Sequence, residues 1–206
     1  MNYWLVKTEP ETFSWEDLKA APQQTTSWEG VRNYQARNNM RDGMKKGDLV
    51  LVYHSVVKPQ VLVGIAEVVR EAYPDPLAVD PKSDYYDPAS KKLGNRWVMV
   101  DLRARQGIEP PITLEEIKQT PGLEQMDLVR KGRLSVQCVT AAEWKIIMRM
   151  RGLKVGCTLF FLTEEQARFR PVNDAVRIAI KHFILPAPLH QPGSFCIGLA
   201  RGRRRQ

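Results

Sequence analysis

The side chains best suited to chemistry in this 206-residue chain gather in one short segment, Trp28-Glu29-Gly30-Val31-Arg32-Asn33-Tyr34. An aromatic ring can stack on the flat face of a nucleobase, and an amide can read the edge of the base as donor and acceptor. Gly30 would let the backbone approach a ligand closely, and Arg32 with Arg37 could neutralise flanking phosphates. The segment therefore has the parts needed to hold a base removed from its stack.

The same residues also have purely structural interpretations. Trp28 could be part of the hydrophobic core, and Asn33 could serve only as a helix cap. The arginines could form a solvated face. The residue types alone leave both interpretations open.

Catalysis is poorly supported by the sequence. A hydrolase needs a nucleophile, a base and an orienting group within reach of one another. His54 and Ser55 are neighbours at a strand end, and successive side chains on a strand point to opposite faces. An enzyme that acts on a base or nucleotide through His54 remains the alternative to a binding module.

No metal or cofactor is expected. The sequence has no paired histidines at helical spacing, twinned cysteines, calcium loop, phosphate loop or glycine-rich dinucleotide motif. The three cysteines, Cys138, Cys157 and Cys196, are widely spaced and fit ordinary reduced thiols. No stretch approaches the roughly eighteen apolar residues of a membrane span, and the chain begins without a secretory segment. We therefore expect no membrane partner and a cytoplasmic location, or a nuclear one in a eukaryote.

Strands are expected where apolar residues run together or alternate. The run 49–54 and the similar run 61–69 fit strands that are covered on both faces and form the centre of a sheet. Between residues 73 and 95 the pattern predicts a long functional or mobile loop with little regular structure. The predicted strands cover residues 3–8, 49–54, 61–69, 97–102 and 134–139.

Helix starts are expected where a capping side chain precedes an apolar stripe. Ser14, Thr113 and Thr140 each stand three residues before an acidic side chain, as in a capping box. Asn33 is expected to cap a helix over residues 34–41, with Gly43 as its stop.

This mixture of strands and helices predicts an α+β fold, a small and partly closed mixed β-barrel with helices packed on the outside. We expect one domain over residues 1–152 and a basic extension over 153–206. The segment from Lys154 onward holds nine of the 31 Lys and Arg but three of the 23 Asp and Glu, so it carries +6 of the net charge of +8. Any phosphate contact of the nearly neutral domain must therefore come from a local patch.

Several motifs resemble the EVE domain family. The first is Tyr3-Trp-Leu-Val-Lys-Thr-Glu-Pro10, and the second runs from Trp28 to Asn38 as Trp-Glu-Gly-Val-Arg-Asn-Tyr-Gln-Ala-Arg-Asn. The others are Val52-Tyr-His-Ser55, Gly64-Ile-Ala-Glu67, Ala72-Tyr-Pro-Asp-Pro76, Asp80-Pro-Lys-Ser83, Tyr86-Asp-Pro88 and Leu128-Val-Arg-Lys-Gly-Arg-Leu-Ser-Val136.

The resemblance covers about 150 residues and implies a PUA-like barrel that is related to the YTH readers of methylated adenine. It also implies a partner, nucleic acid carrying a modified base such as a modified cytosine in DNA or a modified RNA base. It does not decide which base, or whether a protein partner exists. A protein-interaction domain that uses the tail is a further alternative.

Carried over to this chain, the resemblance implies a set of base-binding residues. A set of phosphate-binding residues is expected instead from residue type and position, since Arg130, Lys131 and Arg133 surround Gly132 in a turn and Arg37 follows the aromatic segment. The tail from residue 153 has no counterpart in the family pattern. Trp15, Trp97 and Trp144 fit packing positions. The nucleobase set is Trp28, Val31, Arg32, Asn33, Tyr53, His54, Ser55, Lys7, Glu9, Leu134 and Ser135, and the phosphate set is Arg37, Arg130, Lys131 and Arg133.

Overall fold

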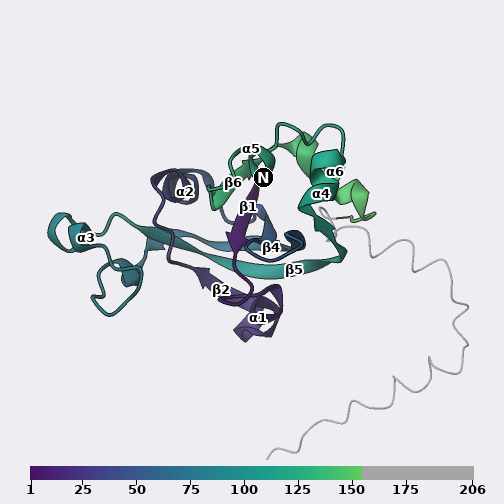
Figure 1. The fold of residues 1–206 in the computed structure, drawn as a ribbon. Coiled ribbons are helices and arrows are strands. Elements are labelled where there is room, and N and C mark those ends of the chain that lie inside the picture. The colour runs from purple at the N-terminus through teal and green to yellow at the C-terminus, as the bar shows by residue number, and fades with distance from the viewer. Residues whose placement is uncertain (155–206) are drawn as a thin grey trace, which may run out of the picture. The chain divides into compact units, whose positions relative to one another are not determined.

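The computed structural model describes residues 1–154, which fold around one six-stranded sheet (Figure 1). The strand order is β2-β5-β4-β3-β1-β6, with β1 parallel to β3 and every other neighbouring pair antiparallel. The strands are β1 (Tyr3–Thr8), β2 (Thr25–Trp28), β3 (Leu49–His54), β4 (Val61–Pro74), β5 (Val98–Thr113) and β6 (Val136–Val139).

The mixed α+β class predicted from the sequence is confirmed, but the predicted partly closed barrel is not. In the described part of the chain, β2 and β6 lie at the two ends of the strand order and do not pair with each other. The sheet is therefore open between these two edge strands.

Helices cover both faces of the sheet, and alternation along β3 explains why both are apolar. Val50 and Val52 belong to a core with Trp15 and Leu18 of the first helix, whereas Leu51 belongs to a second core with the last helices. In Figure 1 the first helix lies on one side of the sheet and α4 and α6 on the other. The α-helices are α1 (Trp15–Ala20), α2 (Tyr34–Asn38), α3 (Pro88–Leu93), α4 (Leu114–Gln119), α5 (Asp127–Arg130) and α6 (Ala141–Met150).

The predicted helix caps are confirmed. Ser14, Thr113 and Thr140 form capping boxes at the starts of α1, α4 and α6. The Asn33 side chain accepts the Ala36 N–H at 3.0 Å, and α2 continues into a π-helical turn, η2 (Asn39–Gly43). Trp15, Trp97 and Trp144 are buried, as their packing interpretation predicts.

The long loop predicted over residues 73–95 is only partly irregular. β4 extends to Pro74, and the segment beyond it contains a 3₁₀ turn, η3 (Pro76–Ala78), as well as α3. Another 3₁₀ turn, η1 (Pro22–Gln24), precedes β2, which the apolar pattern did not predict. The predicted extension 153–206, apart from its first two residues, lies outside the described residues.

Among residues 1–154, no helix is long and apolar enough to cross a membrane. The same residues contain no group of three or more His, Cys, Asp or Glu side chains that could hold a metal ion.

Candidate functional site

A cavity of about 860 Å³ opens where the end of β1, the segment after β2, the turn after β3 and the turn before β6 meet. Its volume falls within the roughly 300–1,000 Å³ range of small-molecule sites. Its walls are formed by Lys7, Thr8, Glu9, Thr12, Phe13, Thr26, Ser27, Trp28, Glu29, Gly30, Val31, Arg32, Asn33, Ser55, Val56, Gln60, Tyr85, Gly132, Arg133 and Ser135.

Trp28 and Val31 give this cavity an apolar wall and also belong to the core. Their exposed fractions are 8% and 7%, and both pack in the core cluster on the α1 side of the sheet. The core and pocket interpretations of Trp28 are thus both supported, since one part of the side chain packs inside while another borders the cavity.

The backbone between them is shaped by Gly30, which has φ +75°. A side chain is rarely stable in this left-handed region, and a Cβ at Gly30 would lie 3.0 Å from the ring of Tyr85. The Gly30 N–H donates to Asp75 Oδ2 at 3.1 Å. Glycine is required here because the aromatic wall and the backbone meet closely.

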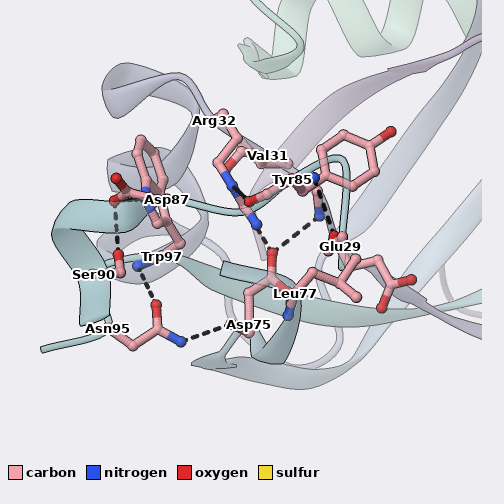
Figure 2. Close-up of polar contacts among 12 residues, drawn as sticks. Glu29, Val31, Arg32, Asp75, Leu77, Tyr85, Asp87, Ser90, Asn95 and Trp97 are labelled. Carbon is pink, nitrogen blue, oxygen red and sulfur yellow. Dashed lines mark hydrogen bonds and ion pairs between the residues drawn. The ribbon is translucent and has the colours of Figure 1, made fainter. Parts of the chain in front are cut away.

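Arg32 clamps this segment to the loop that follows β4. Its Nη1 lies 2.7 Å from Asp75 Oδ2, and its Nε donates to the Tyr85 carbonyl at 2.6 Å (Figure 2). The guanidinium also lies 5.5 Å from the centre of the Trp97 ring, within cation–π range. Because the buried carboxylate of Asp75 neutralises its charge, Arg32 is a wall residue and does not fit the phosphate contact suggested by the sequence.

Lys7 joins the end of β1 to the turn before β6. Its Nζ donates to the Gly132 carbonyl at 2.9 Å, and its backbone N–H donates to the Ser135 carbonyl at 2.9 Å. Burial lowers the pKa of Lys7. A cationic donor therefore stands on a partly desolvated wall of the cavity.

The structure brings most of the sequence-predicted base-binding residues to this one cavity. Asn33 is exposed there, with its Oδ1 already engaged as the α2 cap. Ser55 is tied to β1 through a 3.1 Å hydrogen bond from its hydroxyl to the Thr8 carbonyl. The predicted base-binding residues that border the cavity are Lys7, Glu9, Trp28, Val31, Arg32, Asn33, Ser55 and Ser135.

Three predicted base-binding residues do not border the cavity. Tyr53 is buried in the core on the α4 and α6 side, where burial raises its pKa to about 12. Leu134 is buried in the opposite core. His54 accepts the Trp15 N–H on Nε2 at 3.0 Å, and burial lowers its pKa. Tyr53 and His54 end β3, and Leu134 lies just before β6. Successive side chains along a strand point to opposite faces of the sheet, so residues that are neighbours in a motif do not all face the cavity.

Of the four predicted phosphate-binding residues, only Arg133 reaches the cavity. Lys131 is paired with Asp127 at 3.0 Å, and Arg130 donates to Gln125. Arg37 donates to Asn38 and to the Arg96 carbonyl and lies over the Tyr34 ring. Arg133 is exposed and forms no hydrogen bond or ion pair with any other residue of the described part.

Sequence reasoning did not select several wall residues. Tyr85 lies in the segment Asp84-Tyr85-Tyr86-Asp87-Pro88, whose aromatic and acidic composition was the available signal. Thr26 and Ser27 belong to β2, which gave no strand signal. The other wall residues not selected are Thr8, Thr12, Phe13, Glu29, Val56, Gln60 and Gly132.

Comparison with known proteins identifies the family. A model of the EVE domain matches residues 2–150. The chain belongs to the EVE domain family. The family resemblance seen in the motifs is thereby confirmed.

Relatives and solved structures agree with this assignment. Thymocyte nuclear protein 1 of mouse is 43% identical over 166 residues, which cover 72% of this chain and 73% of that protein. A hypothetical protein from Leishmania major superposes with a TM-score of 0.69 at 47% identity, over 74% of this chain and 95% of that one. The human THYN1 protein in complex with 5-methylcytosine-containing DNA superposes with a TM-score of 0.70 at 38% identity, over 75% of this chain and 99% of that one.

Proposed function

We propose that this EVE domain binds a modified nucleobase of nucleic acid in the 860 Å³ cavity and leaves the base chemically unchanged. One observation supports this function above the others: the similar human protein has been solved with DNA that contains 5-methylcytosine. We take 5-methylcytosine in DNA as the first ligand to test. We also propose that this open sheet is a PUA-like fold, as the family resemblance implies.

The walls offer what a flipped base requires. Trp28, Val31 and Phe13 provide apolar surface, and an added methyl group on a base gains free energy from such surface. Thr26, Ser27 and Gln60 offer hydroxyl and amide groups to the edge of the base. The pocket would thus select by shape and hydrogen bonding.

The charge distribution indicates that selection of the base and attraction to phosphates come from different parts of the chain. Residues 1–153 hold 22 basic and 20 acidic side chains, whereas the segment from Lys154 onward is strongly basic. Attraction of the basic segment to phosphates does not depend on the base sequence of the nucleic acid. Discrimination between bases would therefore come from the cavity, with Arg133 as its contact to a neighbouring phosphate.

An enzyme that uses His54 is not favoured by the geometry. His54 Nε2 accepts the backbone N–H of Trp15. The His54 side chain does not border the cavity. A general base must reach the proton that it removes. The tail-based protein-interaction alternative rests on residues outside those described.

The proposal can be tested by filling the cavity. Replacing Trp28 would remove core packing together with the wall, so Ser27→Leu is the better variant because Ser27 borders the cavity and is only half-buried. Thr25→Leu is the matched control on the same strand, outside the cavity. The affinity of each protein is measured for oligonucleotides that differ only in one cytosine or 5-methylcytosine.

We expect Ser27→Leu to remove the preference for the methylated oligonucleotide and Thr25→Leu to retain it. Equal binding of the two oligonucleotides by the unmodified protein would contradict 5-methylcytosine as the ligand. Retention of the preference by Ser27→Leu would contradict the cavity as the site.

A further inference from the structure

The turn that connects β3 to β4 forms a ridge between two hollows. Val56 and Gln60 border the main cavity and also a second cavity of about 390 Å³. The far wall of this second hollow comes from α4 and its capping residue Thr113, and includes Lys118 of the last helical turn. A segment with a hollow on each side projects from the surface.

Both ends of this ridge are fixed to the body. The Ser55 N–H donates to the Thr8 carbonyl at 2.9 Å, and the Leu114 N–H donates to the Gln60 carbonyl at 2.9 Å. The Tyr53 hydroxyl donates to Gln60 Oε1 at 3.0 Å. The ridge is therefore positioned before any ligand arrives.

Val56 is the most exposed large hydrophobic residue of this ridge, and its backbone conformation is one that folding alone does not explain. Its φ is +68°, an unfavourable value for a β-branched residue. Its side chain is 70% exposed, so it gains little from burial in return for the backbone strain. Such outliers gather at binding sites, where the surrounding structure holds them in place.

We propose that Val56 is a wedge that enters the base stack of a duplex at the place left empty by the base in the cavity. The inference rests on the proposed function, since it requires a base to leave the stack. Removing a base from a duplex costs stacking and pairing energy, and apolar side chains inserted between base steps stabilise the opened duplex. Val56 meets the two requirements of such a wedge because it is apolar and stands at the mouth of the cavity.

Two parts of the site then have two different tasks. The depth of the cavity would recognise the base, whereas the ridge would stabilise the gap in the duplex. Single-stranded nucleic acid has no paired gap to fill, so Val56 should matter for duplexes and not for single strands.

The test compares Val56→Gly and Val56→Leu in the full chain. Glycine suits the positive φ and removes the side chain, whereas leucine keeps an apolar group on the ridge. Val79→Gly is the control, because Val79 is also an exposed valine, at 40%, but borders neither cavity. The probes are a single strand with one 5-methylcytosine, the same strand paired with its complement, and the duplex with an abasic site opposite the 5-methylcytosine.

We expect Val56→Gly to weaken binding of the paired duplex about tenfold while single-strand binding stays unchanged. Val56→Leu and Val79→Gly should bind the duplex like the unmodified protein. The loss in Val56→Gly should shrink for the duplex with the abasic site, since less pairing is broken when that base leaves the stack.

Equal duplex affinities of Val56→Gly and the unmodified protein would overturn the wedge. A parallel loss for single strands would overturn it as well, because it would make Val56 a contact to the base itself. A fourth probe, the same single strand with cytosine in place of 5-methylcytosine, detects failure of the proposed function separately. The unmodified protein would then bind the two single strands equally.

Discussion

Arg133 and Lys131 stand two positions apart in the exposed turn before β6, but their contacts differ. Arg133 borders the cavity and is unpaired among residues 1–154, whereas Lys131 is held by Asp127. We predict that Arg133→Ala weakens oligonucleotide binding and lowers the slope of log affinity against log salt by about 1, the effect of one lost phosphate contact. Lys131→Ala should leave the slope unchanged. Titrations at several salt concentrations measure both, and identical slopes would contradict a phosphate contact by Arg133.

Gly30 allows a second prediction at the residue scale. Gly30→Ala places a Cβ 3.0 Å from the Tyr85 ring, whereas Gly152→Ala places one in open space, although Gly152 also has a positive φ of +61°. Each variant should lose roughly 1–2 kcal/mol of stability from backbone strain. Only Gly30→Ala should weaken oligonucleotide binding, since it displaces Tyr85 from the cavity wall. Thermal unfolding and binding titrations check this, and normal binding by Gly30→Ala would contradict the role of Tyr85.

Predicted site residues gather at the cavity where the chain turns and diverge where it is extended. The segment from Trp28 to Asn33 is short and sharply bent, so four of its predicted side chains reach one cavity. In the motif Val52-Tyr-His-Ser55 adjacent side chains diverge, and only Ser55 borders the cavity. A motif quoted as continuous sequence does not show which of its residues face the ligand.

Elements were predictable where their signals are local. Capping boxes depend on residues three positions apart, and all three lie where the sequence placed them. The strand β2 has four residues and is half-buried except for Trp28, so its apolar pattern is weak. It is stabilised by pairing with β5, in which Trp28 faces Val100. Such distant pairing has no local signature in the sequence.

Asp75 connects the elements around the site. Its carboxylate has no exposed surface and accepts from the N–H of Gly30, the N–H of Leu77 and Arg32. We predict that Asp75→Asn lowers the free energy of unfolding by about 3 kcal/mol, because the Arg32 side chain, which is only 21% exposed, loses its counter-charge. Asp80→Asn, in the exposed part of the same loop, should change it by less than about 0.5 kcal/mol. Denaturant unfolding distinguishes these outcomes, and similar values for the two variants would contradict the clamp.

Glu116 makes the free energy of unfolding depend on pH in the acid range. Hydrogen bonds from the Thr113 backbone and from Arg151 lower its pKa to about 2. Since the ordinary pKa of glutamate is about 4.3, the stabilisation is complete above that pH and is lost as the pH falls through about 2.

We therefore predict that Glu116→Gln is less stable than the unmodified protein at pH 7 and that the difference disappears as the pH falls through about 2. The difference at pH 7 should be about 1 kcal/mol, because Glu116 is 40% exposed and water screens the ion pair. Unfolding curves between pH 7 and pH 2 measure it, with Glu115→Gln as the control. A difference that is independent of pH would contradict the assigned cause.

At the scale of the whole molecule, the sequence predicted the α+β class and the family but not the open sheet. Strand pairing across the chain joins residues such as Leu5 and Gln137, and alternation of apolar residues does not encode which strands are neighbours. The charge division was visible in the sequence itself. General attraction to nucleic acid would come from the basic segment and should weaken as the salt concentration rises. Selection of the base would come from the cavity and should not depend on salt.

The most direct test of a base-selecting cavity is the ratio of affinities for 5-methylcytosine and cytosine oligonucleotides, measured at low and high salt for the full chain and for Ser27→Leu. We predict that both affinities of the unmodified protein fall with salt while their ratio stays constant and favours 5-methylcytosine. For Ser27→Leu the ratio should be close to one at every salt concentration. A preference that survives in Ser27→Leu, or that disappears with rising salt, would contradict the account.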